Sequence, residues 1–205
     1  MTDHYFTASP GGPRRPRTVR VRLDERDVEL ASDASVFSAD RLDPGTRVLL
    51  TETPAPRRGV LLDLGCGYGV IACVQAQRQP DAEVWAVDVN ERARELCRRN
   101  AVRNHLDNIV VAGPDEVPDD IRFSTIWSNP PIRIGKPALR ELLLRWLARL
   151  DDDGTATLVV QKHLGADSLQ RWLTVEGHRT ERLASKSGFR LLEVSPRGAE
   201  GPERR

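Results

Sequence analysis

The chain has 205 residues, of which 39% are hydrophobic and 30% charged, and its formal net charge is +1. These values predict one globular domain and exclude a general electrostatic attraction to nucleic acid, so that any basic binding surface must be local. No apolar run approaches the roughly 20 residues of a membrane span, and residues 1–12 lack the apolar segment of a signal peptide. The cysteines form no Cys-x-x-Cys pair, which argues against a metal site and favours free thiols in a cytoplasmic protein. They are Cys66, Cys73 and Cys97.

Residues 1–17 are rich in Pro, Gly and Arg and are predicted to form an irregular basic arm. The densest basic stretch of the chain begins here and comprises Arg14, Arg15, Arg17, Arg20 and Arg22. Such a stretch is either a solvated tail or an arm that binds a polyanion through counterion release. The sequence leaves both interpretations open.

A small extension is predicted over residues 18–50. Two alternating runs, Thr18–Leu23 and Asp27–Ala31, predict a β-hairpin. Leu42–Thr51 predicts a short helix that begins with Pro44 at its first position.

Strands and helices then alternate over residues 51–197, and residues 198–205 are predicted to be a disordered tail. The predicted strands are Val60–Leu64, Glu83–Val87, Asn108–Val111, Phe123–Trp127 and Thr155–Val160. The predicted helices are Gly69–Gln79, Glu91–Asn104, Pro137–Leu150 and Asp167–Val175, the last capped by Asp167. Arg179–Ala184 and Phe189–Val194 predict an antiparallel hairpin around Ser187 and Gly188. This pattern predicts an α/β fold with a mostly parallel sheet and helices on both faces.

A glycine-rich segment follows the first buried strand. Residues 63–69 read Asp-Leu-Gly-Cys-Gly-Tyr-Gly, and the glycines allow a sharp turn and close approach to a ligand. Asp88 ends the next strand, where a carboxylate can accept hydrogen bonds from both hydroxyls of a ribose. The spacing differs from the dinucleotide pattern, and Asp63 would repel a pyrophosphate. We therefore expect a nucleoside ligand with an ammonium or sulfonium group, such as S-adenosylmethionine; a tight turn without a ligand is the alternative.

A second motif, Ser-Asn-Pro-Pro-Ile at residues 128–132, follows the strand Phe123–Trp127. Its prolines stiffen the turn, so that the Asn129 side-chain oxygen and the Pro130 carbonyl can accept two hydrogen bonds from one NH₂ group. Holding both hydrogens favours a tetrahedral nitrogen whose lone pair points at a methyl carbon. Positioning and electrostatics then suffice, and no general base is required. A rigid surface turn is the alternative interpretation.

These two motifs resemble those of the class I methyltransferases. More closely, the chain resembles the small-subunit ribosomal RNA guanine-N2 methyltransferase family in its short single-domain form. The segments that carry this closer resemblance are Val36-Phe37-Ser38, Leu42-Asp43-Pro44-Gly45-Thr46, Arg133-Ile134-Gly135-Lys136, Gln161-Lys162 and Gly188-Phe189-Arg190. The resemblance implies a Rossmann-like class I methyltransferase fold, S-adenosylmethionine as cofactor, and ribosomal RNA or a ribosomal subunit as partner.

The resemblance also implies roles for individual residues. The cofactor would be bound by Asp63, Gly65, Cys66, Gly67, Asp88, Val89, Asp115 and Asn129. Asn129 and Pro130 would be catalytic, because they would hold the target amine. The substrate would be bound by Phe37, Pro131, Ile132, Arg133 and Lys136. Phe37 would cover the cofactor or stack on the target base, with a core position as the alternative. Arg133 and Lys136 would meet phosphates, unless they are solvated charges.

The chain departs from the family pattern in two respects. It is too short for the additional N-terminal domain of larger members, and Ile132 stands where many relatives carry an aromatic residue that can stack on a flipped base. Phe37, or Tyr5 and Phe6 of the arm, could supply stacking instead. Three other functions stay open: methylation of a glutamine side-chain amide on a protein, a non-catalytic domain that binds cofactor or RNA, and, as the weakest, a dehydrogenase.

Overall fold

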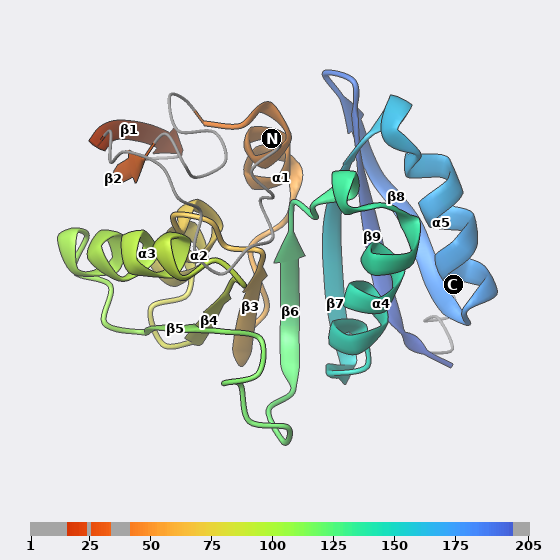
Figure 1. The fold of residues 1–205 in the computed structure, drawn as a ribbon. Coiled ribbons are helices and arrows are strands. Elements are labelled where there is room, and N and C mark those ends of the chain that lie inside the picture. The colour runs from red at the N-terminus through yellow and green to blue at the C-terminus, as the bar shows by residue number, and fades with distance from the viewer. Residues whose placement is uncertain (1–15, 24–25, 34–41, 199–205) are drawn as a thin grey trace.

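The computed structural model describes residues 16–23, 26–33 and 42–198. Within them, one seven-stranded sheet has the strand order β5-β4-β3-β6-β7-β9-β8, and two further strands form a separate sheet (Figure 1). Phe37, Tyr5, Phe6 and residues 14–15 of the basic arm lie outside the described residues. The same is true of most of the predicted C-terminal tail.

The central sheet is mostly parallel. Its strands are β3 (Val60–Leu64), β4 (Glu83–Val87), β5 (Ile109–Ala112), β6 (Phe123–Ser128), β7 (Leu150–Gln161), β8 (His178–Lys186) and β9 (Phe189–Arg197). The strands β3 to β7 pair in parallel, whereas β9 runs antiparallel to both β7 and β8. The predicted α/β architecture with an antiparallel C-terminal hairpin is confirmed.

Helices cover both faces of this sheet. They are α1 (Pro44–Glu52), α2 (Val70–Arg78), α3 (Glu91–Arg103), α4 (Lys136–Leu147) and α5 (Ala166–Val175), with short 3-10 turns η1 (Ile132–Ile134) and η2 (Lys162–Leu164). Apolar residues of α4 and α5 share one core cluster, and those of α1, α2 and α3 share another with the alternate residues of the strands. The sheet is therefore a layer between two helical layers, as continuous apolar strands require.

Several predicted boundaries were wrong. The strand β7 begins at Leu150, five residues before the predicted Thr155, and the preceding helix ends at Leu147. Asp167 does not cap α5: Gly165 takes the N-cap position with φ 99°, and Asp167 lies in the first turn. The Asp167 carboxylate instead forms ion pairs with Arg182 and Arg190, so tertiary charge pairing overrides the local capping preference.

The reversal of strand order lies between β3 and β6. The chain moves from β3 through β4 to β5 on one side, and from β6 through β7 to β9 and β8 on the other. Connections therefore diverge above the carboxyl ends of β3 and β6. A crevice forms at such a point in open α/β sheets.

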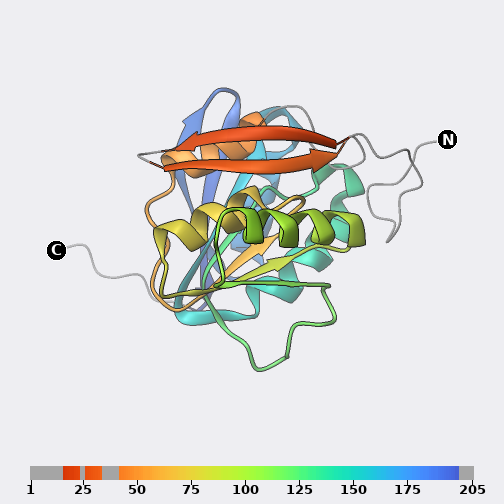
Figure 2. The ribbon, with the colours of Figure 1, turned by 90° about the vertical axis from the view of Figure 1, so that its left-hand side faces the viewer.

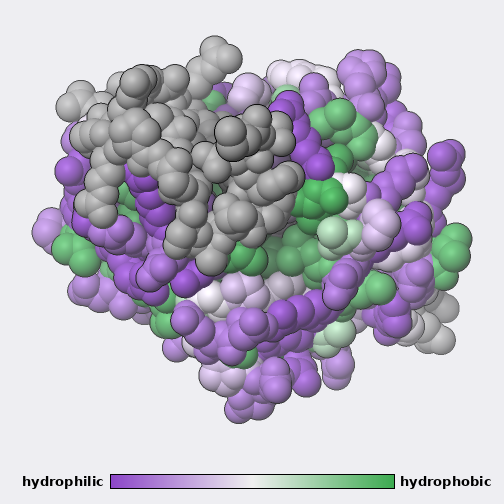
Figure 3. Space-filling model, viewed as in Figure 1, coloured by the Kyte–Doolittle hydropathy of each residue, from purple (hydrophilic) through white to green (hydrophobic). Residues whose placement is uncertain are grey.

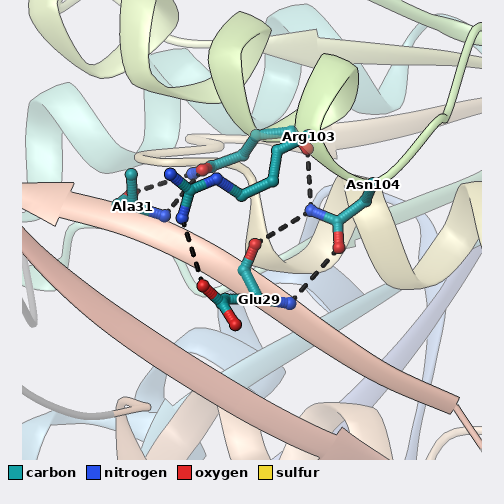
Figure 4. Close-up of polar contacts among 5 residues, drawn as sticks. Glu29, Ala31, Arg103 and Asn104 are labelled. Carbon is teal, nitrogen blue, oxygen red and sulfur yellow. Dashed lines mark hydrogen bonds and ion pairs between the residues drawn. The ribbon is translucent and has the colours of Figure 1, made fainter.

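The N-terminal hairpin, β1 (Pro16–Leu23) and β2 (Arg26–Asp33), packs against α3 (Figure 2). Asn104 exchanges two hydrogen bonds with the Glu29 backbone, at 3.2 and 3.0 Å, and Asn100 exchanges two with the Ala31 backbone, at 2.7 and 2.8 Å (Figure 4). Side chains four residues apart on a helix are ~6 Å apart along its axis, close to the ~6.6 Å between alternate strand residues. The two amides therefore satisfy the outer edge of β2 as a neighbouring strand would.

Asn100 also links this hairpin to the glycine-rich segment. Its Nδ2 donates to the Tyr68 carbonyl at 2.8 Å, and its side chain is fully buried.

Among the described residues, no helix is long and apolar enough to cross a membrane.

We expect Asn100→Ala to lower the free energy of unfolding by about 2–4 kcal/mol, because it leaves buried backbone groups of Ala31 and Tyr68 without partners. Arg103→Ala is the matched control on the same helix. It removes only an exposed ion pair with Glu29 at 3.4 Å, which should cost less than about 1 kcal/mol. Urea denaturation measures both, and equal losses would show that Asn100 does not anchor the hairpin.

Candidate functional site

The carboxyl ends of β3, β4 and β6 meet in a cavity of about 290 Å³. Of the residues predicted from sequence, Gly65, Asp88, Val89, Asn129 and Pro131 line it. Apolar side chains gather in a hollow at the centre of the face seen in Figure 3, bordered by hydrophilic ones. The volume is near the lower end for small-molecule sites, roughly 300–1,000 Å³.

The glycine-rich segment forms the turn from β3 into α2. Gly65 has φ 78°, and a Cβ on it would meet no atom within 4 Å, so that it opens onto free space. Gly69 has φ 91°, and a Cβ there would lie 2.5 Å from the Cys97 sulfur of α3. One glycine therefore serves the turn at the cavity, and the other allows α2 and α3 to pack closely.

Asp88 holds the rim of the cavity together. One of its carboxylate oxygens accepts the Gly67 N–H at 2.9 Å, and the other accepts the Asn90 N–H at 2.8 Å. Burial raises the pKa of Asp88, while these two hydrogen bonds and the nearby Arg94 oppose the rise. Each carboxylate oxygen keeps a further lone pair for a hydroxyl in the cavity.

Asp63 lies beneath the turn and lines neither this cavity nor the smaller hollow beside it. It is fully buried, and one oxygen accepts the Ala72 N–H at 2.9 Å in the first turn of α2. Its other oxygen has no hydrogen-bond partner among the described residues. Burial raises its pKa to about 8, and the neighbouring Asp88 adds to the rise.

The side-chain amide of Asn129 is fixed in orientation. Its Nδ2 donates to the carboxylate of Asp43 at 2.7 Å and to the hydroxyl of Thr46 at 3.0 Å. A carboxylate only accepts hydrogen bonds, so the nitrogen must face Asp43, and Oδ1 is the Asn129 side-chain atom left to accept from a ligand. Asp43 is also the N-cap of α1, where the same oxygen accepts the Thr46 N–H at 2.9 Å.

The two prolines after Asn129 fix the orientation of the Pro130 carbonyl. Pro131 has φ −75° and ψ 76°, an inverse γ-turn in which Ile132 N–H donates to the Pro130 carbonyl at 2.8 Å. A carbonyl oxygen has two lone pairs, so Pro130 keeps one for a ligand. Pro130 itself is buried and lines neither the main cavity nor the smaller hollow, whereas Asn129 lines both.

Several predicted site residues lie elsewhere. Cys66 and Gly67 line the smaller hollow of about 40 Å³ that also includes Asp43, Thr46 and Asn129. The Asp115 side chain is 90% exposed and pairs with Arg145 at 2.8 Å, while Pro114 lines the main cavity in its place.

The substrate residues after the prolines also turn away. Ile132 and Lys136 line a separate small hollow against α5, and Ile134 lines the main cavity instead. Arg133 is exposed. In the 3-10 turn η1 successive side chains point about 120° apart, so Ile132 and Ile134 face different sides, which a linear motif does not reveal.

The sequence interpretation missed Asp43, Thr46 and the cavity-facing side of α4, including Leu142 and Trp146. In the sequence, Asp43 and Thr46 stand out only as part of the segment Leu42-Asp43-Pro44-Gly45-Thr46, and no local signal marks the α4 residues that line the cavity. Nothing in the described residues groups three or more His, Cys, Asp or Glu side chains in a way that could hold a metal ion.

A family model described as "Methyltransferase small domain" matches residues 27–193. The chain is 32% identical over 198 residues to the uncharacterized protein YbxB of Bacillus subtilis (strain 168), covering 95% of this chain and 98% of that protein. It is 37% identical over 180 residues to ribosomal RNA small subunit methyltransferase C of Aeromonas hydrophila, covering 84% of this chain and 51% of that protein. This chain therefore spans about half the length of that relative.

A solved structure of the T. thermophilus 16S rRNA N2 methyltransferase RsmC, in complex with AdoMet and guanosine, has a similar fold. The TM-score is 0.72 at 23% identity, over 92% of this chain and 52% of that one. A ribosomal protein L11 methylase from Lactobacillus delbrueckii matches with a TM-score of 0.61 at 19% identity, over 77% of this chain and 84% of that one. At these identities the likeness shows the fold alone.

The raised pKa of Asp63 makes stability depend on pH. Its proton is bound more tightly in the folded chain than in the unfolded one, so this contribution to stability is complete below about pH 4 and is lost as pH rises through about 8. We expect the thermal midpoint to fall between pH 5 and 8.5 more steeply than that of Asp63→Asn, in which the site is neutral at every pH. Parallel curves from thermal denaturation would show that Asp63 is ionised in the folded protein.

Proposed function

Because this chain belongs to the methyltransferase small domain family, we propose that it methylates an exocyclic amine, namely N2 of a guanine in ribosomal RNA. S-adenosylmethionine is the methyl donor that this family membership implies. The RsmC fold neighbour, described as an rRNA N2 methyltransferase, supports the choice of guanine N2. A cytoplasmic location follows from the proposal, since ribosomes are there.

The observation that carries the proposal is the fixed amide of Asn129. Its NH₂ is bound by Asp43 and Thr46, so its carbonyl oxygen is the group available to a substrate. With the Pro130 carbonyl it forms a pair of acceptors, which suits an NH₂ group that offers two hydrogens. This pair selects an amine and orients its lone pair, and no side-chain base is needed.

The residues present fit S-adenosylmethionine. Gly65 leaves free space where a Cβ would stand, and the open lone pairs of Asp88 suit the hydroxyls of a ribose. Asp63 lies beneath the turn and outside the cavity, where its hydrogen bond with the Ala72 N–H holds the start of α2 against that turn. The cofactor supplies an electrophilic methyl group on a sulfonium, and Gly65, Asp88 and Asn129 would position it against the amine.

The test begins with calorimetric titration of S-adenosylmethionine, followed by tritiated methyl transfer to bulk ribosomal RNA and nucleoside analysis. Label in N2-methylguanosine supports the proposal. Label only in protein would favour the glutamine amide, which presents the same two hydrogens. Binding of the cofactor without transfer would favour a non-catalytic domain.

We expect Asn129→Ala to lower kcat by about 10²–10³-fold while the Kd for S-adenosylmethionine changes little, because the acceptor acts on the amine. Asp88→Ala is the complementary variant and should weaken cofactor binding. Equal effects of Asn129→Ala on Kd and kcat would assign Asn129 a structural role.

Asp43→Asn separates the two roles of Asp43. Asparagine caps a helix about as well as aspartate, so α1 should keep its stability. An asparagine at 43 can also donate a hydrogen bond, so the Asn129 side-chain amide can flip and exchange its oxygen and nitrogen. We therefore expect kcat to fall about tenfold with KM unchanged. An unchanged kcat would show that Asp43 serves only as a cap.

A further inference from the structure

A second, basic hollow of about 380 Å³ lies at the tip of the β8–β9 hairpin. Eight residues line it, and four of these carry a positive charge: Lys162, Arg182, Lys186 and Arg190. The others include Ser185 and Ser187, whose hydroxyls can donate hydrogen bonds, and no carboxylate of the described residues lines the hollow.

The walls of this hollow are held in place by backbone. Ser187 and Gly188 have φ 51° and 81°, as a two-residue type I′ hairpin requires, so that β8 and β9 join without a loose loop. The Gly188 carbonyl accepts the Lys162 N–H at 2.8 Å, which ties η2 to the hairpin tip. The backbone segments that carry the cations, at the end of β7 and in the β8–β9 hairpin, are thus held around the hollow.

These cations are only partly neutralised. Lys186 pairs with Glu52 at 2.6 Å, and Arg182 and Arg190 share the single carboxylate of Asp167. Within the described part of the chain, the Lys162 side chain has no ion-pair or hydrogen-bond partner, and it is exposed. The Lys186 side chain is 57% exposed and that of Glu52 28%, so solvent screens the pair and another anion can replace the carboxylate at little cost.

The basic hollow lies on the same edge of the sheet as Asn129. Asn129 directly follows β6, and β7, β9 and β8 come after β6 in the sheet, so the hollow is one to three strand spacings of about 4.8 Å away. Phe189, which also lines the hollow, packs against Gly45 of α1, next to the Asp43 that holds Asn129. The basic hollow and the surroundings of Asn129 are therefore in contact through Phe189 and α1.

We propose that the basic hollow binds the phosphodiester backbone of RNA beside the target nucleotide. Phosphates recur every ~3.4 Å along a stacked strand, so the distance from Asn129 corresponds to a few nucleotides. Donor-only side chains and hydroxyls are the groups that bind phosphate oxygens without reading sequence. The inference rests on the proposed function for the identity of the target, and it assigns docking to Lys162 and Lys186.

The test compares Lys162→Gln/Lys186→Gln with a control double variant, Arg58→Gln/Arg99→Gln. The control removes the same charge: Arg58 lies just before β3 at the opposite edge of the sheet, and Arg99 forms an exposed ion pair on α3. Binding of a short guanine-containing single-stranded RNA is titrated over a range of salt concentrations. A DNA strand of the same sequence is the second probe and asks whether the hollow requires RNA.

We expect the lysine double variant to reduce the slope of log affinity against log salt by about 1.4, since each phosphate contact on a single strand contributes ~0.7. The KM for RNA should rise while kcat and the Kd for S-adenosylmethionine stay the same, and the control should match the wild type. An unchanged slope, or an equal loss in the control, would overturn the inference.

The two proposals can fail separately. If the wild type forms N2-methylguanosine and the lysine variant keeps the wild-type slope, the docking site is wrong and the function stands. If the slope falls but no RNA is methylated, the hollow binds RNA and the proposed reaction is wrong. If the wild type binds no RNA, the docking site is refuted directly.

Discussion

The hydrogen bond from the Asn129 amide to the Asp43 carboxylate is the constraint on which the candidate site depends. An amide presents a donor at one end and an acceptor at the other, and the two ends differ little in shape. Only a partner of fixed polarity decides which end faces a ligand. Asp43 provides it and caps α1 with the same oxygen, so the position of a helix and the chemistry of the Asn-Pro-Pro motif are set together.

The carboxyl edge of the sheet carries acidic groups on one side and basic groups on the other. On the β3 and β4 side, Asp63 and Asp88 give the glycine-rich turn a negative surrounding, partly relieved by their raised pKa values. On the β7, β9 and β8 side, the basic hollow gathers cations. The strand order reverses between these groups, with Asn129 at the boundary. A chain of net charge +1 thus acquires a local basic surface without an overall attraction to polyanions.

The N-terminal hairpin is attached to the site through the same kind of group. Asn100 binds both the backbone of β2 and the carbonyl of Tyr68 in the glycine-rich segment. Through the hydrogen bonds of Asn100, the position of the hairpin is therefore coupled to that of the turn that lines the cavity. The family model begins at residue 27, within the hairpin, which agrees with its being part of the same structural unit.

The sequence by itself determined the fold class, and it predicted several of the residues that line the main cavity. Val60–Leu64 and Glu83–Val87 were predicted with their observed bounds, because a strand buried on both faces must be an apolar run. Asp88 and Asn129 could be placed together, because parallel strands end at one edge. Asp115 and Ile132 do not line the main cavity and Asp167 does not cap α5, since the direction of a turn and the partner of a charge depend on contacts from distant segments. The tertiary structure alone decided that Asp43 orients Asn129, a contact between residues 86 positions apart that no local pattern encodes.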